Sequence, residues 1–279
     1  MENYQLGKSN WRTAEQGLEK EWLMVNGIGG YSNCSVTGEL TRSHSGYLVA
    51  AMNPPVERML ILGKTQERLD IGTHTVDLAC QRYLGKEKDG CRYLEHFSLE
   101  AVPQYLYQVE DVFVKKTIAL VRGENTVAVC YEIENGMEPA VLHITPLFNV
   151  REAASMTDKS AISYKQSLTK NVLTLETEKY PNIITKFYTT EGTYVDRSTY
   201  PTSMAAPTFV VEEDLCYNID VRTGSHSLDS HYTPYDIDVE LKPFEKKKFY
   251  MICSIEDTDI TKVDGFQVVE DYKKAIKFV

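Results

Sequence analysis

Two short segments near the N-terminus carry residue types that suit contact with a hydroxyl-rich ligand. The segment EWLMVNGIGGY begins at Glu21, and the segment TRSHSGYLVAA begins at Thr41. Their glycines let a backbone or a ligand approach closely, and the tyrosine, arginine and histidine offer a ring face and hydrogen-bond donors. We take them as candidates for binding a sugar or docking another domain: Asn26, Gly27, Gly29, Gly30, Tyr31, Arg42, His44, Ser45 and Gly46.

Each candidate also has a plain structural explanation. Asn26-Gly27 is a strong turn signal by itself, and Arg42 with His44 could belong to a solvated loop or a salt bridge to Glu57. The spacing of the glycines does not fit a dinucleotide-binding loop, which needs a third glycine three residues further on. For Glu57-Arg58, a structural ion pair is the favoured interpretation.

Nothing in the sequence specifies catalytic or metal-binding chemistry. Catalysis by a carboxyl pair needs two carboxyl groups held across one bond, about 5–5.5 or 6.5–9.5 Å apart depending on mechanism, and isolated residues such as Glu95 and Asp77 do not indicate such a pair. The other histidines are scattered without metal-ligand spacing, and the six cysteines lie far apart. We therefore predict no catalytic residue, no metal and no cofactor in this chain. His143, between Leu142 and Ile144, is expected on a strand, facing away from the core.

Composition describes an ordinary globular protein that favours neutral ligands. The chain has 279 residues, of which 42% are hydrophobic and 25% charged, with a net charge of −10. This charge disfavours nucleic acid and anionic membranes as partners. The first residues do not form a signal peptide, and no apolar stretch could span a bilayer. We expect a reduced, cytoplasmic protein.

Period-two patterning predicts an all-β fold with a helix at the end. Val127, Val129, Tyr131 and Ile133 share one face of a strand at Thr126–Glu134. Further strands are expected at Val112–Val121, Ala140–Phe148, Val172–Glu178, Ile183–Thr189, Cys216–Arg222, Asp236–Leu241 and Phe249–Ile255. Many strands with short turns predict a large antiparallel two-sheet β-sandwich. Helical spacing of apolar residues predicts a helix at Val268–Val279.

The ordered blocks in the first half resemble a known family. EWLMVNGIGGY, TRSHSGYLVAA and NPPVER, followed by YLE-x-F at Tyr93, GENTV at Gly123 and Pro146-Leu147 with Arg151, resemble the bacterial and archaeal glycogen debranching enzymes of amylo-α-1,6-glucosidase type. The second block departs from the family pattern, which has Arg-Tyr-His where this chain has Ser43, His44 and Ser45. A histidine shifted by one position on a strand faces the other way, so a sugar contact there would be altered or lost.

The resemblance implies an architecture and a role. The fold would be a supersandwich like the N-terminal domain of glucoamylase, here residues 1–255, with a linker and helix at 256–279 leading to an (α/α)6 catalytic barrel that this chain lacks. The chain would then be a non-catalytic domain that packs on the barrel and shapes an α-glucan site, with glycogen as the glucan. Two alternatives stay open: a free-standing carbohydrate-binding module for glycogen or starch, and a small mutarotase-like sugar enzyme.

Overall fold

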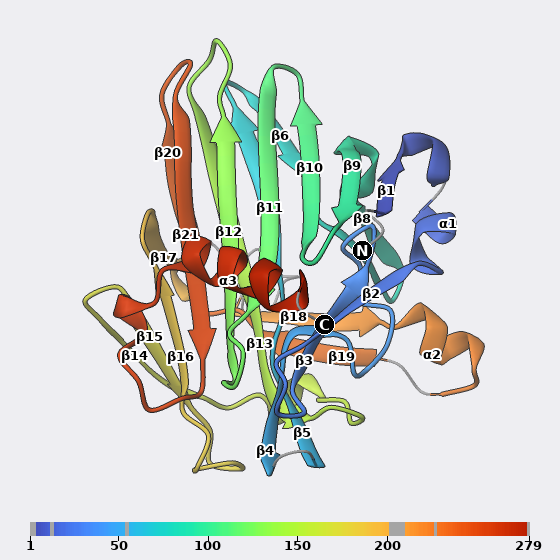
Figure 1. The fold of residues 1–279 in the computed structure, drawn as a ribbon, viewed down its shortest axis with the longest axis vertical. Coiled ribbons are helices and arrows are strands. Elements are labelled where there is room, and N and C mark those ends of the chain that lie inside the picture. Colours follow the sequence, from blue (N-terminus) through green and yellow to red (C-terminus); the bar gives the residue numbers. More distant parts are fainter. Residues whose placement is uncertain (1–3, 12–13, 54–55, 201–209, 226–227, 278–279) are drawn as a thin grey trace.

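The computed structural model describes residues 4–11, 14–53, 56–200, 210–225 and 228–277, and it is a two-sheet antiparallel β-sandwich (Figure 1). This confirms the predicted all-β fold class. In the described residues one sheet has nine strands in the order β1-β9-β10-β11-β12-β21-β16-β15-β14. They span Tyr4–Gly7 (β1), Leu94–Leu99 (β9), Pro103–Val109 (β10), Val112–Leu120 (β11), Thr126–Glu134 (β12), Lys246–Ser254 (β21), Thr185–Thr189 (β16), Val172–Glu176 (β15) and Lys165–Thr169 (β14).

The second sheet has twelve strands in the described residues and carries both candidate loops. Its main path is β2-β3-β4-β5-β13-β19-β18-β7-β8, while β20 pairs with β13 and β17, and β6 pairs with β5. The strands are Glu21–Val25 (β2), Tyr31–Ser35 (β3), Gly46–Asn53 (β4), Val56–Ile71 (β5), His74–Asp77 (β6), Cys80–Tyr83 (β7), Lys86–Asp89 (β8), Ala140–Glu152 (β13), Thr193–Asp196 (β17), Val211–Cys216 (β18), Leu228–Tyr232 (β19) and Tyr235–Leu241 (β20).

Three α-helices lie in the described part of the chain: Ala14–Leu18 (α1), Asn218–Arg222 (α2) and Gly265–Lys277 (α3). The helix predicted at the end of the chain is confirmed within the described residues, and Val279 lies outside them. Val268, Val269 and Tyr272 are its buried face. Figure 1 shows α3 lying across β11 and β12. This helix explains why Ala128 and Cys130 of β12 are buried although they alternate with the core-facing residues.

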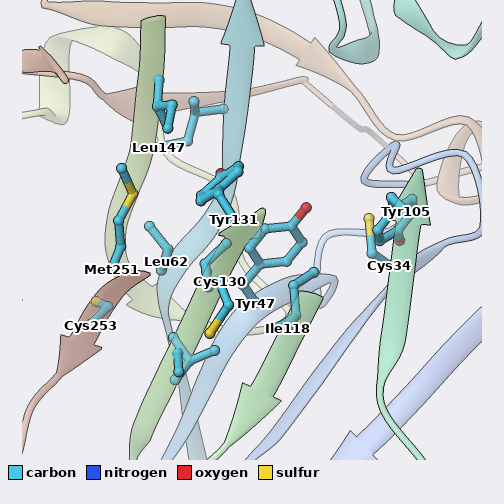
Figure 2. Close-up of a cluster of buried hydrophobic side chains, with 14 of the residues drawn as sticks. Cys34, Tyr47, Leu62, Tyr105, Ile118, Cys130, Tyr131, Leu147, Met251 and Cys253 are labelled. Atoms are coloured by element: carbon cyan, nitrogen blue, oxygen red, sulfur yellow. The ribbon is translucent and has the colours of Figure 1, made fainter. Parts of the chain in front are cut away.

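The core lies between the two sheets and is lined by alternating side chains from both. The predicted core-facing residues of β12 are at most 1% exposed: Val127, Val129, Tyr131 and Ile133. Figure 2 shows Tyr131 with Tyr47 of β4 and Leu62 of β5 in this layer. Such alternation lets each sheet bury one complete face, which is how two stacked sheets hold together without a central helix.

One expected strand was wrong. Only Cys216 of the predicted Cys216–Arg222 strand belongs to β18, because residues 218–222 form the short helix α2. Tertiary contacts override local propensity here, since the backbone N–H of Ile219 donates to the carbonyl of Thr41 at 3.1 Å. Pro54, Pro55 and His226 lie outside the described residues. No helix of the described residues has the length and apolarity that a membrane span requires.

Candidate functional site

The two candidate loops are neighbours in the structure. The hydroxyl of Tyr31 donates to the backbone carbonyl of His44 at 2.9 Å. The strands that follow the loops pair with each other, with Tyr31 opposite Val49 and Asn33 opposite Gly46. Burial raises the pKa of Tyr31, so its hydroxyl keeps the proton it donates at neutral pH. The sheet therefore fixes the two loops against each other.

Asn26 organises the first loop from the inside. It is fully buried, its backbone N–H donates to the carbonyl of Gly30 at 3.0 Å, and its Oδ1 accepts from the N–H of Ile28 at 3.1 Å. Gly27 and Gly29 between them have positive φ values of 89° and 103°. These left-handed positions require glycine, so the glycines first of all make the turn. The buried Asn26 itself is a structural residue.

A second asparagine locks this turn to the sheet. The Oδ1 of Asn125 accepts from the backbone N–H of Ala51 at 2.9 Å and from the Nδ2 of Asn26 at 3.3 Å. A Cβ atom on Gly30 would lie 2.4 Å from the Asn26 Nδ2 and 3.0 Å from the carbonyl oxygen of Val49. Because these neighbours leave no room for a side chain, Gly30 is required for close packing rather than for access by a ligand.

The second loop is held by its backbone. The N–H of Ser43 donates to Oδ2 of Asp220 at 2.7 Å, and the carbonyl of Ser43 accepts from Nη2 of Arg151 at 2.7 Å. Ser45 is fully buried, and within the described residues its hydroxyl has no hydrogen-bond partner. A Cβ on Gly46 would lie 2.3 Å from Cδ1 of Leu60. Ser45 and Gly46 are thus packed inside the domain, while His44 lines the surface.

A buried ion pair lies behind this loop. The guanidinium of Arg151 donates to Oδ2 of Asp229 from Nη2 at 2.7 Å and from Nε at 3.1 Å, and both residues are 1% exposed. Its Nη1 donates to the backbone carbonyls of Glu152 and Ala153 at 3.0 and 2.8 Å. Every nitrogen of the guanidinium therefore has an acceptor, as a buried charge requires.

Two further buried side chains complete this cluster. The hydroxyl of Tyr217 donates to Oδ2 of Asp229 at 2.6 Å, and Nε2 of His231 lies 3.2 Å from that hydroxyl. Burial by itself raises the pKa of Asp229, but the charge of Arg151 and hydrogen bonds from His231 and Tyr217 hold it well below its usual range. Asp229 is therefore ionised at neutral pH. The cluster is enclosed, and it braces the loop instead of meeting a ligand.

Arg42 and Arg58 have partners that the sequence did not identify. Nε of Arg42 pairs with the carboxylate of Glu21 at 3.0 Å, not with Glu57. The ion pairs formed by the described residues include none between Glu57 and Arg58. Nε of Arg58 donates instead to the carbonyl of Gly29 at 2.9 Å, and its guanidinium lies 5.9 Å from the centre of the Tyr31 ring. Glu57 is exposed with a φ of 55°, so its backbone leaves the regular strand geometry.

Two adjacent grooves meet at the surface of these loops. One has a volume of about 850 Å³ and the other about 600 Å³, and Tyr31, His44 and Arg58 line both. The smaller groove also contains Leu23 and Val25, which are 63% and 46% exposed. The structure therefore brings together Tyr31, Arg42, His44 and Arg58 at the surface. It places Asn26, Ser45 and the glycines beneath or between them.

The comparisons with known proteins cover most of the chain. Residues 20–248 match the family described as the N-terminal domain of glycogen debranching enzyme. The chain belongs to this family. The matched residues of this glycogen debranching enzyme N-terminal domain include residues from several sequence blocks that contribute to the loops and their support: Asn26 and Tyr31 from the first, and Arg58, Asn125 and Arg151 from later ones. No curated protein matches the chain.

Two solved structures that resemble this glycogen debranching enzyme N-terminal domain do so with low sequence identity. A putative kojibiose phosphorylase from human microbiome has 9% identity and a TM-score of 0.44, with 94% of this chain and 31% of that chain covered. A bacterial glucoamylase complexed with acarbose has 9% identity and a TM-score of 0.41, with 91% and 34% covered. The chain spans about a third of the length of these two proteins. The described residues contain no group of His, Cys, Asp or Glu that could hold a metal ion.

Proposed function

We propose that the chain is the non-catalytic N-terminal domain of a glycogen-debranching-like glycoside hydrolase of amylo-α-1,6-glucosidase type. Its joined loops would dock on a catalytic barrel and form one wall of the α-glucan site. The observation that carries this proposal is the contrast between rigid support and exposed tips. Arg151 and Asp220 hold the backbone of the second loop, and Asn125 holds the Asn26 side chain of the first, while Tyr31 and His44 line open grooves. Rigid scaffolds that present exposed loops are typical of binding surfaces.

The position of α3 supports the same face as the docking surface. The hydroxyl of Tyr272 lies 3.2 Å from the backbone N of Val25 and 3.1 Å from its carbonyl oxygen. Figure 1 shows the last turn of α3 close to β2. A catalytic domain that follows α3 would therefore begin beside the smaller groove, next to the exposed side chains of Leu23 and Val25. Apolar surface rimmed by charged residues suits a domain interface.

Variants at the loop tips test docking. Arg42→Ala and His44→Ala should change the unfolding free energy of the 279-residue chain by less than about 1 kcal/mol, because an exposed ion pair contributes little. In a longer protein that carries the barrel, they should weaken association or activity. Arg222→Ala is the matched control, since Arg222 lies on α2 in an exposed pair with Glu19. Losses above about 2 kcal/mol in the isolated chain would mean that Arg42 and His44 belong to its own packing.

The reading frame after Val279 separates the two main interpretations. A continuation that encodes a barrel supports the proposal, and a stop codon would favour the free-standing module for glycogen or starch. The isolated chain should release no glucose from a branched limit dextrin. The proposal includes a cytoplasmic location, where the six cysteines, all free in the described residues, stay reduced.

A mutarotase-like activity has less physical support. It would need an imidazole that is free to exchange a proton with a sugar. His143 lies in a polar cleft, but its Nδ1 is 2.7 Å from Oδ1 of Asp238 and its Nε2 is 3.0 Å from Oδ2 of Asp70. With both nitrogens engaged by carboxylates, the imidazole is better suited to holding the cleft together than to proton transfer.

A further inference from the structure

The segment that leads into the loop of His44 is held from two sides. On one side, the side chain of Gln81 in β7 bonds both backbone groups of Leu40. Its Oε1 accepts from the N–H at 3.1 Å, and its Nε2 donates to the carbonyl at 3.3 Å. Gln81 and Leu40 are fully buried, so β7 is the fixed side of this support. The helix α2 lies on the other side.

Consecutive residues of α2 bond alternate residues of the segment. Nδ2 of Asn218 donates to Oε1 of Glu39 at 3.0 Å. The N–H of Ile219 donates to the carbonyl of Thr41 at 3.1 Å. The next residue of the helix holds the N–H of Ser43, as described above. The position of α2 therefore sets the position of the backbone from residue 39 to residue 43, directly before His44.

The helix α2 is itself weakly anchored. It has five residues, and of these only Asp220 is buried, while residues 221–225 are exposed. Figure 1 shows α2 at the edge of the molecule. A helix this short has no stability of its own, and an element with few buried contacts opens at low free energy. Because Asn218 is half-buried above the fully buried Glu39, opening of α2 brings water to the Glu39 carboxyl.

The carboxyl of Glu39 has no cation in contact with it. The ion pairs formed by the described residues include none with Glu39: Nζ of Lys64 donates to two backbone carbonyls at 2.8 and 2.7 Å, and the guanidinium of Arg82 pairs with α1. The nearest carboxylate on α2, that of Asp220, is bonded to the loop. Burial raises the pKa of Glu39 to about 7, against a smaller lowering by the charges of Lys64 and Arg82.

Two thiols complete the surroundings of this carboxyl. Sγ of Cys80 donates to Oε2 of Glu39 at 3.8 Å, and Sγ of Cys34 donates to the backbone carbonyl of Glu39 at 3.2 Å. Burial raises the pKa of Cys34 to about 11. A hydrogen bond with Cys91, together with burial, raises the pKa of Cys80 well above its usual value. Both thiols therefore stay neutral between pH 6 and pH 8, where Glu39 changes its charge.

We propose that Glu39 is a positioning residue for the loop of His44: its neutral carboxyl keeps α2 closed on the segment, and its ionisation favours an open α2 that releases Ser43. An ionised carboxylate without a contacting cation is stabilised more by water than by one amide and one thiol, and opening of α2 admits that water. This opening takes place in the 279-residue chain itself. Only its consequence, weaker docking above neutral pH, rests on the proposed function.

Amide hydrogen exchange of the 279-residue chain, divided by the intrinsic exchange rate at each pH, measures the opening. The opening constants at Ile219 and Ser43 should exceed those of the β12 amides. They should rise about tenfold from pH 6 to pH 8, because the Glu39 pKa is about 7 in the closed form and 4.5 in water. Glu39→Gln keeps the side-chain shape and the acceptor for Asn218, so it should fold, with equal opening constants at both pH values.

Arg222→Ala is the matched control, since it removes an exposed ion pair from α2 and should keep the pH dependence of the wild type. Equal opening constants at pH 6 and pH 8 in the wild type would overturn the proposal, as would the same rise in Glu39→Gln. Exchange of Ile219 and Ser43 only together with β12 would also overturn it, because Glu39 would then act on global stability alone.

The outcomes for α2 and for docking are separable. A pH-dependent opening together with normal barrel association in His44→Ala would support the positioning role of Glu39 and remove the docking role. A pH-independent opening together with weakened association in His44→Ala would do the reverse.

Discussion

Replacing Arg151 by methionine tests whether the buried ion pair supports the loop of His44. The change keeps a long apolar side chain but removes the charge that compensates Asp229. Asp229 would keep its hydrogen bonds from Tyr217 and from the N–H groups of Thr157 and Ser230. Breaking a buried pair by removing one partner leaves an uncompensated charge and costs about 3–5 kcal/mol. That loss is a large part of the 5–15 kcal/mol typical of a domain.

The carbonyl of Ser43 makes this variant a test of the loop as well as of the core. It would lose its donor, Nη2 of Arg151, so the loop of His44 should become mobile. Chemical denaturation should give a lower midpoint with an unchanged slope, and hydrogen exchange should quicken at residues 43–46. The matched variant Arg42→Met, which removes an exposed arginine from the same loop, should change the unfolding free energy by less than about 1 kcal/mol.

The unfolding free energy measured at decreasing pH provides a second test of the same pair. The pKa of Asp229 is lower in the folded protein than in the unfolded chain, where it is about 3.9. Its contribution is therefore present above pH 5 and is lost as the pH falls below about 4. Asp229→Asn should be less stable at neutral pH but should lose less on acidification. The reasoning would be refuted if Arg151→Met lowered the unfolding free energy by less than about 1 kcal/mol. It would also be refuted if the wild type and Asp229→Asn lost the same unfolding free energy on acidification.

Three other variants follow from the same geometry. Gly30→Ala should lower the unfolding free energy by about 1–3 kcal/mol in a urea titration, because its Cβ would lie 2.4 Å from Nδ2 of Asn26. The control Gly7→Ala, whose Cβ would meet its nearest atom at 3.7 Å, should leave the unfolding free energy nearly unchanged. Burial raises the pKa of Glu39 to about 7, so the unfolding free energy of the wild type should fall by about 3 kcal/mol as the pH rises from 4 to 8. Glu39→Gln should show a flatter dependence of this free energy on pH. Parallel curves for the two proteins would contradict the prediction. Tyr272→Phe should cost about 1 kcal/mol in thermal or urea unfolding by removing the hydroxyl bonded at Val25; no change would mean that this contact contributes nothing.

The strands were predictable wherever alternation is strong and local. Thr126–Glu134 matches β12 at both ends, and Asp236–Leu241 differs from β20 by one residue. The sequence analysis missed the helix α2 because the helix is held by residues far away in the sequence. The N–H of Ile219 donates to Thr41, and the carboxylate of Asp220 accepts from Ser43. Such contacts leave no periodic signal in the local residues.

The sequence located the two candidate loops, but not the roles of the residues within them. Sequence motifs located Asn26, Tyr31 and His44, yet only the fold shows that Asn26 is buried and His44 is at the surface. The Arg151–Asp229 pair joins residues 78 positions apart. No spacing rule connects them, although Arg151 stood at the end of a recognisable block. The cleft at His143 was missed for the same reason, since its partners come from three strands.

The contact between Tyr272 and Val25 also has a consequence for solubility. In the described residues β2 is the outermost strand of its sheet, and such an edge offers open peptide groups to strands of other molecules. The Tyr272 hydroxyl accepts from the backbone N–H of Val25 and donates to its carbonyl, close to the exposed Leu23. A chain shortened before α3 would uncover this edge together with the apolar surface of β11 and β12. Such a fragment should self-associate through strand pairing, and light scattering against the 279-residue chain would detect it.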